Sequence, residues 1–229
     1  MSTVLSIVIR SGLARLFAGL ALLACTGCVS VREGLMDDLQ ERKYFTPTNF
    51  VGEPRLPVNL HRVLLLPVCG GTIIPPETSA TLEEIFATEL QRQLRFEVVR
   101  LTRAECQRRF GAGEFSSSAA LPHDFLTVLG HEFDADAVLF VDITSYKAYR
   151  PLALGLRAKL ATVDETRLLW TFDEIFSADD QAVGNSVKRY FGAVDSSGIP
   201  TDPKHAVLQS PGKFAAYVAS ATFSTLPPR

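Results

Sequence analysis

The sequence predicts an α/β (α+β) fold, in which a mixed β-sheet begins with a parallel βαβ unit, continues into an antiparallel hairpin and carries packed helices. Two observations support this prediction. Residues 63–68 are a continuous apolar run, typical of a strand buried on both faces. Residues 154–160 and 168–172 alternate apolar and mixed side chains with period two, which predicts antiparallel strands with one face open to water.

The first half of the predicted domain is a strand, a helix and a second strand. Residues 81–94 carry apolar side chains at steps of three and four, which predicts an amphipathic helix. Thr81 and Glu84 fit a capping box at its start. Residues 96–102 are expected to form the second strand and 103–110 a short helix, so the unit is a right-handed parallel βαβ.

The second half continues with more strands and helices. The longest strand is expected at residues 135–150, and its apolar first half indicates a central place in the sheet. The hairpin turns at residues 163–166. The other elements are a Gly/Ser-rich loop at 111–122, a helix at 123–134, and amphipathic helices at 178–194 and 211–226.

The N-terminal segment has the pattern of an export signal. Arg10 and Arg15 are the only charges in the first 28 residues, and residues 16–24 are continuously apolar. A bilayer-spanning helix needs roughly 20 apolar residues, so this shorter run predicts a secretory signal peptide. Its end resembles the lipobox of bacterial lipoproteins, in which signal peptidase II cuts before a cysteine whose thiol carries the lipid.

Two cysteines, Cys25 and Cys28, compete for the lipid. The residues before Cys25, Leu22 and Ala24, fit the lipobox better. Cleavage before Cys28 would instead give the apolar run after Arg15 its more usual length. The sequence leaves both cysteines open. In either case the C-x-x-C spacing is not a redox pair, because one cysteine is alkylated or removed. A zinc site would need a second pair of ligands, which the four histidines do not supply: His61, His123, His131 and His205.

The predicted organisation is a signal peptide at residues 1–27, a polar, proline-containing tether at 28–60, and a single α/β domain at 61–229. Loss of the two signal arginines changes the formal net charge from −2 to −4. This mildly acidic balance argues against nucleic-acid binding. The protein is therefore expected in the cell envelope, held by lipid at a membrane, with the outer membrane favoured because no aspartate follows either cysteine.

Chemistry-bearing motifs are scarce in the predicted domain. The sequence contains no G-x-S-x-G elbow, and "CGGT" after the first strand lacks the Lys-Ser/Thr of a phosphate loop. No catalytic residue, metal ligand or cofactor is predicted. Cys69 and Cys106 are expected at one edge of the sheet, as a disulfide in an oxidising compartment or as buried free thiols.

One stretch has the composition of an interaction surface. Tyr146, Tyr149 and Arg150 lie near the turn into the hairpin, and Tyr and Arg are common anchors of protein interfaces. The alternative is that the two tyrosines cover the rim of the core.

The sum of these features resembles a set of envelope lipoproteins with the TolB N-terminal fold, the activator LpoB, and the non-barrel part of the secretion protein CsgG. The resemblance covers roughly residues 61–194 and lies in the lipobox with its tether, in "VLLLPV" with the following helix, and in "ADAVLFVDITSYKAYRPLALGLRAKLATVDETRLLW". It implies a non-enzymatic protein that binds envelope proteins or assembles with copies of itself. Because the loops between the strands here are short, a pore of the CsgG type is not expected.

Two functions follow from the sequence. The favoured one is a lipid-anchored periplasmic domain that binds another envelope protein. The alternative is an envelope enzyme or small-ligand binder with a site at the C-terminal edge of the sheet, near Gly70, Gly71 and Asp142.

Overall fold

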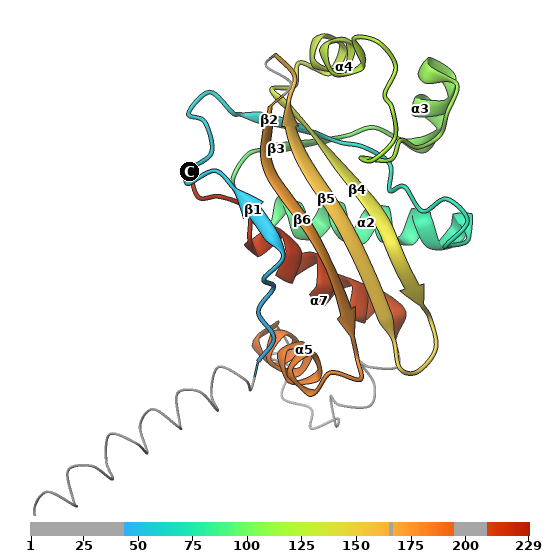
Figure 1. The fold of residues 1–229 in the computed structure, drawn as a ribbon, viewed down its shortest axis with the longest axis vertical. Coiled ribbons are helices and arrows are strands. Elements are labelled where there is room, and N and C mark those ends of the chain that lie inside the picture. The colour runs from blue at the N-terminus through green and yellow to red at the C-terminus, as the bar shows by residue number, and fades with distance from the viewer. Residues whose placement is uncertain (1–43, 165–166, 195–209) are drawn as a thin grey trace, which may run out of the picture. The chain divides into compact units, whose positions relative to one another are not determined.

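The computed structural model describes residues 44–164, 167–194 and 210–229, and residues Phe45–Arg229 form one compact unit. A six-stranded sheet with the order β1-β6-β5-β4-β2-β3 is its centre (Figure 1). The strands are β1 (Phe50–Gly52), β2 (Arg62–Leu65), β3 (Glu97–Arg100), β4 (Ala137–Lys147), β5 (Ala153–Thr162) and β6 (Leu168–Ser177). The helices are α2 (Pro76–Gln91), α3 (Arg103–Phe110), α4 (Phe125–Phe133), α5 (Gln181–Val194) and α7 (Pro211–Ser224).

The strand directions confirm the predicted mixed sheet. β3, β2 and β4 are parallel neighbours, and β4, β5, β6 and β1 are paired antiparallel. The sequence order of these elements is the predicted one, with β1 added at its beginning.

The N-terminal boundary of the domain differs from the prediction. Residues 45–60 were expected in the tether, but β1 pairs with β6, and Leu56 and Leu60 are buried in the core. The sequence did not indicate this packing, because β1 has only three residues and Leu56 and Leu60 are isolated apolar residues near prolines, so the segment shows no periodicity. The C-terminal residues pack in the same region: the Leu56 N–H donates to the Pro228 carbonyl at 2.8 Å, and Arg229 donates to the Leu60 carbonyl.

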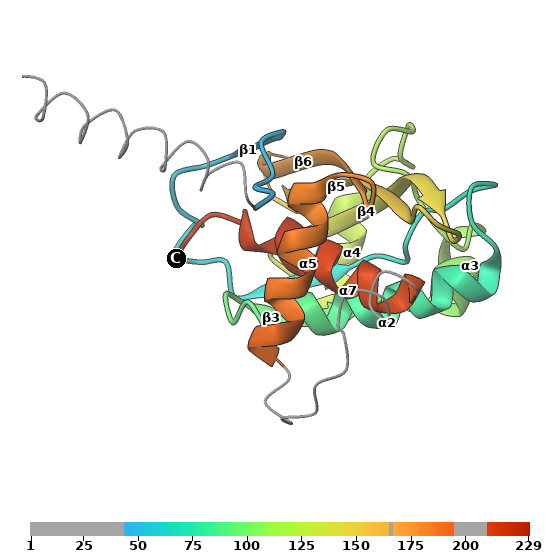
Figure 2. The ribbon, with the colours of Figure 1, turned by 90° about the horizontal axis from the view of Figure 1, so that it is seen from below.

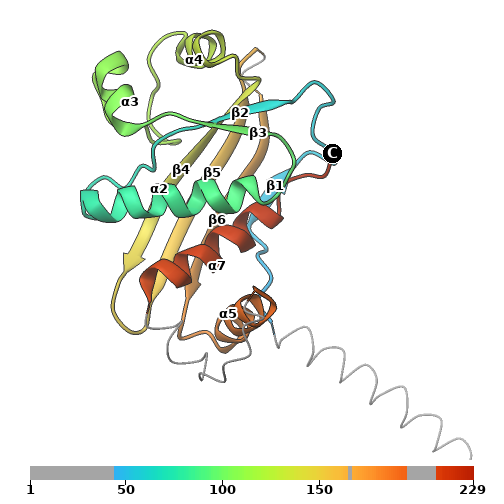
Figure 3. The ribbon, with the colours of Figure 1, turned by 180° about the vertical axis from the view of Figure 1, so that it is seen from behind.

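The two faces of the sheet are covered differently. One face packs on α2 and α7, which cross it side by side (Figures 2 and 3). Large side chains fill this main core, among them Trp170, Phe172, Phe86 and Phe223. On the other face, α3 and α4 cover only the β2 and β4 region through a second cluster that includes Leu64, Phe125 and Leu129. The β5, β6 and β1 part of that face carries no helix among the described residues (Figure 1).

The start of α2 corrects one prediction. The helix begins at Pro76, so Thr81 lies inside it and its hydroxyl donates to the Glu77 carbonyl at 3.1 Å instead of capping the helix. Proline suits a first helical position, because its missing N–H would have no intrahelical partner there. The structure does contain a capping box, formed by Thr102 and Glu105 at the start of α3.

Candidate functional site

The C-terminal ends of the parallel neighbours β2 and β4 are where ligands bind in open α/β sheets, and this place is called the crevice. The chain leaves β2 through α2 on one face of the sheet and enters β4 from α3 and α4 on the other. Cys69 and Asp142 pair as an isolated parallel bridge at this point. The structure therefore brings Gly70, Gly71 and Asp142 to one edge, as the alternative function requires.

This crevice is filled by the protein's own loop between α3 and α4. The Asp142 carboxylate is only 6% exposed and accepts hydrogen bonds from the Ser117 N–H at 3.0 Å, the Ser117 hydroxyl at 2.8 Å and the Ser116 hydroxyl at 3.1 Å. Asp142 lies at the sheet edge where its place in the predicted strand puts it, whereas its serine partners lie about 25 residues away along the chain and leave no sign in the sequence.

Glu114 forms the second anchor of the same loop. It accepts a hydrogen bond from the Gly71 N–H at 2.9 Å and pairs with Arg103, whose guanidinium also binds Glu83 and the Val68 carbonyl, each at 2.7 Å. Burial alone would raise the pKa of the Glu114 carboxyl, but Arg103 and the Gly71 amide outweigh it and lower this pKa. A small ligand would have to displace the loop to reach these groups.

The cysteines of the domain are not joined. Cys69 and Cys106 are both free in the structure, as the free-thiol alternative of the prediction has it. Cys106 is buried on α3 in the second cluster, while the Cys69 sulfur lies at the crevice, 3.7 Å from Glu114 Oε1. Burial, with the charges of Glu114 and Asp142, raises the pKa of Cys69 to about 12. The two lipidation candidates, Cys25 and Cys28, lie outside the described residues.

The predicted interaction residues occupy two neighbouring surfaces. Tyr146 is half-buried against the main core and lines a hollow of about 260 Å³ between the first turns of α2 and α7. Tyr149 is 83% exposed in the turn between β4 and β5, and Arg150 beside it is exposed. The rim-of-core alternative therefore describes Tyr146 well and does not describe Tyr149.

The uncovered sheet face is a surface that sequence analysis missed. Val51, Leu168 and Ile175 are 74%, 50% and 57% exposed on β1 and β6. A hollow of about 250 Å³ lies over the same strands, lined by Asn49, Phe50, Val51, Arg157, Lys159, Thr171, Phe172 and Asp173. Ile175 is out of phase with the core-facing Trp170 and Phe172, so it falls on the polar face of a period-two strand. Leu168 is in phase with them in the sequence and reaches the open face only because the β5–β6 pairing is irregular between Leu160 and Ala161.

The charges of this open face are partly committed to the fold. Arg157 pairs with Asp173 at 2.7 Å, and the Lys159 ammonium donates to the Ser117 carbonyl at 2.7 Å. The described residues contain no carboxylate within 4.0 Å of Lys159, so the face presents a cation beside apolar side chains. β1 itself is a poor template for another strand, because it has three residues between Pro47 and Pro54.

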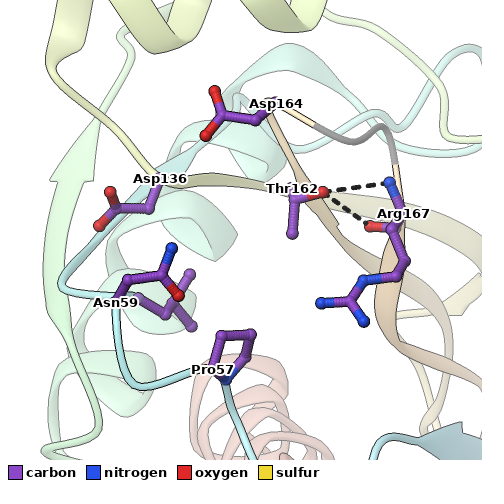
Figure 4. A pocket seen from close by; sticks show the side chains of 7 residues that line it. Pro57, Asn59, Asp136, Thr162, Asp164 and Arg167 are labelled. Atoms are coloured by element: carbon purple, nitrogen blue, oxygen red, sulfur yellow. Dashed lines mark hydrogen bonds between the residues drawn. The ribbon is translucent and has the colours of Figure 1, made fainter.

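A polar pocket of about 100 Å³ lies at the opposite end of β4, beside the β5–β6 turn (Figure 4). Its acidic and basic groups hold the backbone together. Asp136 accepts from the His61 and Arg62 N–H groups at 2.7 and 2.8 Å, and Arg167 pairs with Glu53 at 3.0 Å. Within the described ranges no three His, Cys, Asp or Glu side chains are grouped to hold a metal ion, and no helix is long and apolar enough to cross a bilayer.

No protein-family model matches the chain, and no curated protein sequence matches it. Solved structures that it resembles include the lipoprotein GNA1162 from Neisseria meningitidis, at 17% identity and a TM-score of 0.40, over 58% of this chain and 97% of that one. The PelC dodecamer from Paraburkholderia phytofirmans matches at 13% identity and a TM-score of 0.39, over 58% and 89%. The C-terminal domain of LpoB from Salmonella enterica matches at 16% identity and 0.32, over 51% and 82%. One of these three structures is a bacterial lipoprotein, and likeness at this level carries no conclusion about the function of this chain.

Proposed function

We propose that this chain is a lipid-anchored protein of the bacterial envelope, which acts by binding another envelope protein and performs no chemistry of its own. The lipobox at Cys25 and Cys28 supports the anchor. The absence of an aspartate after either cysteine supports the outer membrane, with the domain in the periplasm.

The observation that carries the binding role is the open sheet face of β1, β6 and β5. Exposed Val51 and Ile175 lie on the same side of the sheet as Lys159. Apolar surface left in water is typical of a docking site, and the cation adds a preference for a partner carboxylate. The partner expected here is a protein surface with apolar side chains around an acidic one.

The crevice between β2 and β4 supports this proposal over the small-ligand alternative. Its polar groups are already bound by Glu114, Ser116 and Ser117 of the same chain. Because the place where ligands bind in such sheets is occupied by the α3–α4 loop, the open face is the better candidate.

Two measurements test the proposal. Intact mass spectrometry of the mature protein should show a lipid on Cys25 or Cys28, and an unmodified mass would refute the anchor. Affinity purification from crosslinked membranes should then recover an envelope protein with the native chain.

The surface is tested with a matched pair of variants. Ile175 on the open face and Ile73 after β2 are 57% and 46% exposed. Ile175→Asp should lose the crosslinked partner, because it places a charge in the apolar contact, whereas Ile73→Asp should retain it. Equal recovery with both variants would remove the open face from the proposal, and recovery of a second copy of this chain alone would make the interface homo-oligomeric.

A further inference from the structure

The domain receives the preceding chain at one end of its sheet. The Phe45 ring lies 5.1 Å from that of Phe176 near the end of β6, and its N–H donates to the Ser186 hydroxyl at 2.8 Å. At the same end, the Ala178 N–H donates at 2.8 Å to the carbonyl of Leu152, which follows the β4–β5 turn. The chain therefore enters the domain beside the tip of this hairpin.

The tip itself presents an aromatic residue between two cations. Lys147, Tyr149 and Arg150 are all exposed, and Tyr149 is 83% exposed. From residue 143 to residue 163 the sequence contains four basic residues and no acidic one. Asp179 and Asp180 lie at this end, in the turn after β6, where Asp180 accepts a hydrogen bond from the Ala182 N–H at the start of α5. A tyrosine flanked by cations fits the headgroup layer of a bilayer, where the ring is half-solvated and the cations face phosphates.

Resting on the proposed lipid anchor, we propose that the hairpin tip at residues 147–150 contacts the anionic phospholipid surface that holds the protein. Either lipidation candidate is at most about 20 residues from Phe45, and such a segment spans no more than roughly 70 Å in any conformation. Because the tether joins the domain at the entry end of the sheet, the proposal places this end nearest the membrane. The opposite end, where Leu94 precedes β3 and is 88% exposed, is then the end farther from the membrane.

The test compares positions 149 and 94, which are nearly equally exposed. The photo-reactive residue benzoylphenylalanine replaces Tyr149 or Leu94 in the full lipidated chain, which is reconstituted into vesicles of phosphatidylethanolamine and phosphatidylglycerol. After irradiation, mass spectrometry should find a phospholipid adduct at position 149 and none above background at position 94.

Charge variants sharpen the same measurement. A basic residue near an anionic surface contributes about 1 kcal/mol, so Lys147→Gln or Arg150→Gln should each reduce the adduct roughly fivefold. The control Arg108→Gln, on exposed α3 surface, should leave it unchanged. In vesicles of neutral phosphatidylcholine the adduct at position 149 should be low even with Lys147 and Arg150 in place, and replacing these two cations should have no further effect.

The outcomes separate this proposal from the function on which it rests. Protein that does not sediment with the vesicles overturns the anchor, and the tip contact with it. Protein that sediments without an adduct at position 149 overturns the tip contact alone. The same irradiation can be done in native membranes with benzoylphenylalanine at position 149. If the adduct found there is a protein instead of a lipid, the tip contact with lipid is also overturned, and Tyr149 and Arg150 are assigned to protein docking.

Discussion

Replacing Asp142 by alanine should release the α3–α4 loop from the crevice. The buried carboxylate accepts three hydrogen bonds, from the Ser117 N–H, the Ser117 hydroxyl and the Ser116 hydroxyl. Hydrogen bonds to a charged group contribute about 1.5–3 kcal/mol each. The freed donors lie on a loop that can turn toward water, so the loss in unfolding free energy should be about 2–4 kcal/mol, below the sum of three bonds.

Two further variants at aspartates separate the causes of this loss. Asp142→Asn keeps an acceptor oxygen and the side-chain volume, so it should cost about 1–2 kcal/mol through the lost charge. Asp164→Ala removes an exposed aspartate in the β5–β6 turn and should change stability by less than about 0.5 kcal/mol.

Urea unfolding can be followed through the single tryptophan, Trp170, which is buried in the main core. Hydrogen exchange of the Ser117 amide reports the loop directly, and this amide should exchange faster in Asp142→Ala. An unchanged unfolding midpoint together with unchanged Ser117 protection would refute the account of the crevice.

Three other predictions concern single side chains. Thr144→Val should raise the unfolding free energy by about 1 kcal/mol in a denaturant titration, because the Thr144 hydroxyl is buried with no hydrogen-bond partner among the described residues; a loss of stability would contradict this. Glu114 has a lowered pKa in the folded state, so its stabilising effect is complete above its unfolded pKa near 4.5 and disappears as the pH falls further. Glu114→Gln should therefore flatten the acid side of a stability–pH curve, and an unaltered slope would be inconsistent with the ion pair to Arg103. Cys69, with its pKa raised from 9.0 to about 12, should react with iodoacetamide at neutral pH roughly a thousandfold more slowly than an ordinary thiol, and a normal rate in the folded protein would disprove the burial argument.

The elements with strong periodicity could be predicted from the sequence, and those built by distant contacts could not. The hairpin alternation and the amphipathic helices led to the right order of strands and helices. β1 has three residues and is too short to show a period. α2 starts at Pro76, five residues before the expected cap at Thr81, because the fixed backbone angle of proline suits a first helical position.

The candidate sites show the same division. Asp142 could be placed at the sheet edge because it lies within a recognisable strand. Its serine partners could not be found, since hydrogen bonds between residues 25 or 26 positions apart leave no local pattern. The open face became visible only when β6 was paired and no helix of the described chain covered that side.

The contacts between the first and last parts of the domain have a consequence for biosynthesis. Arg229 binds the carbonyl of Leu60, 169 residues earlier, and Arg55 binds the carbonyl of Arg229 across 174 residues. These contacts can form only after Arg229 has been synthesised. Contacts between segments this far apart along the chain form late in folding, and in the exported precursor that we propose this delay favours passage through the membrane before the domain is complete.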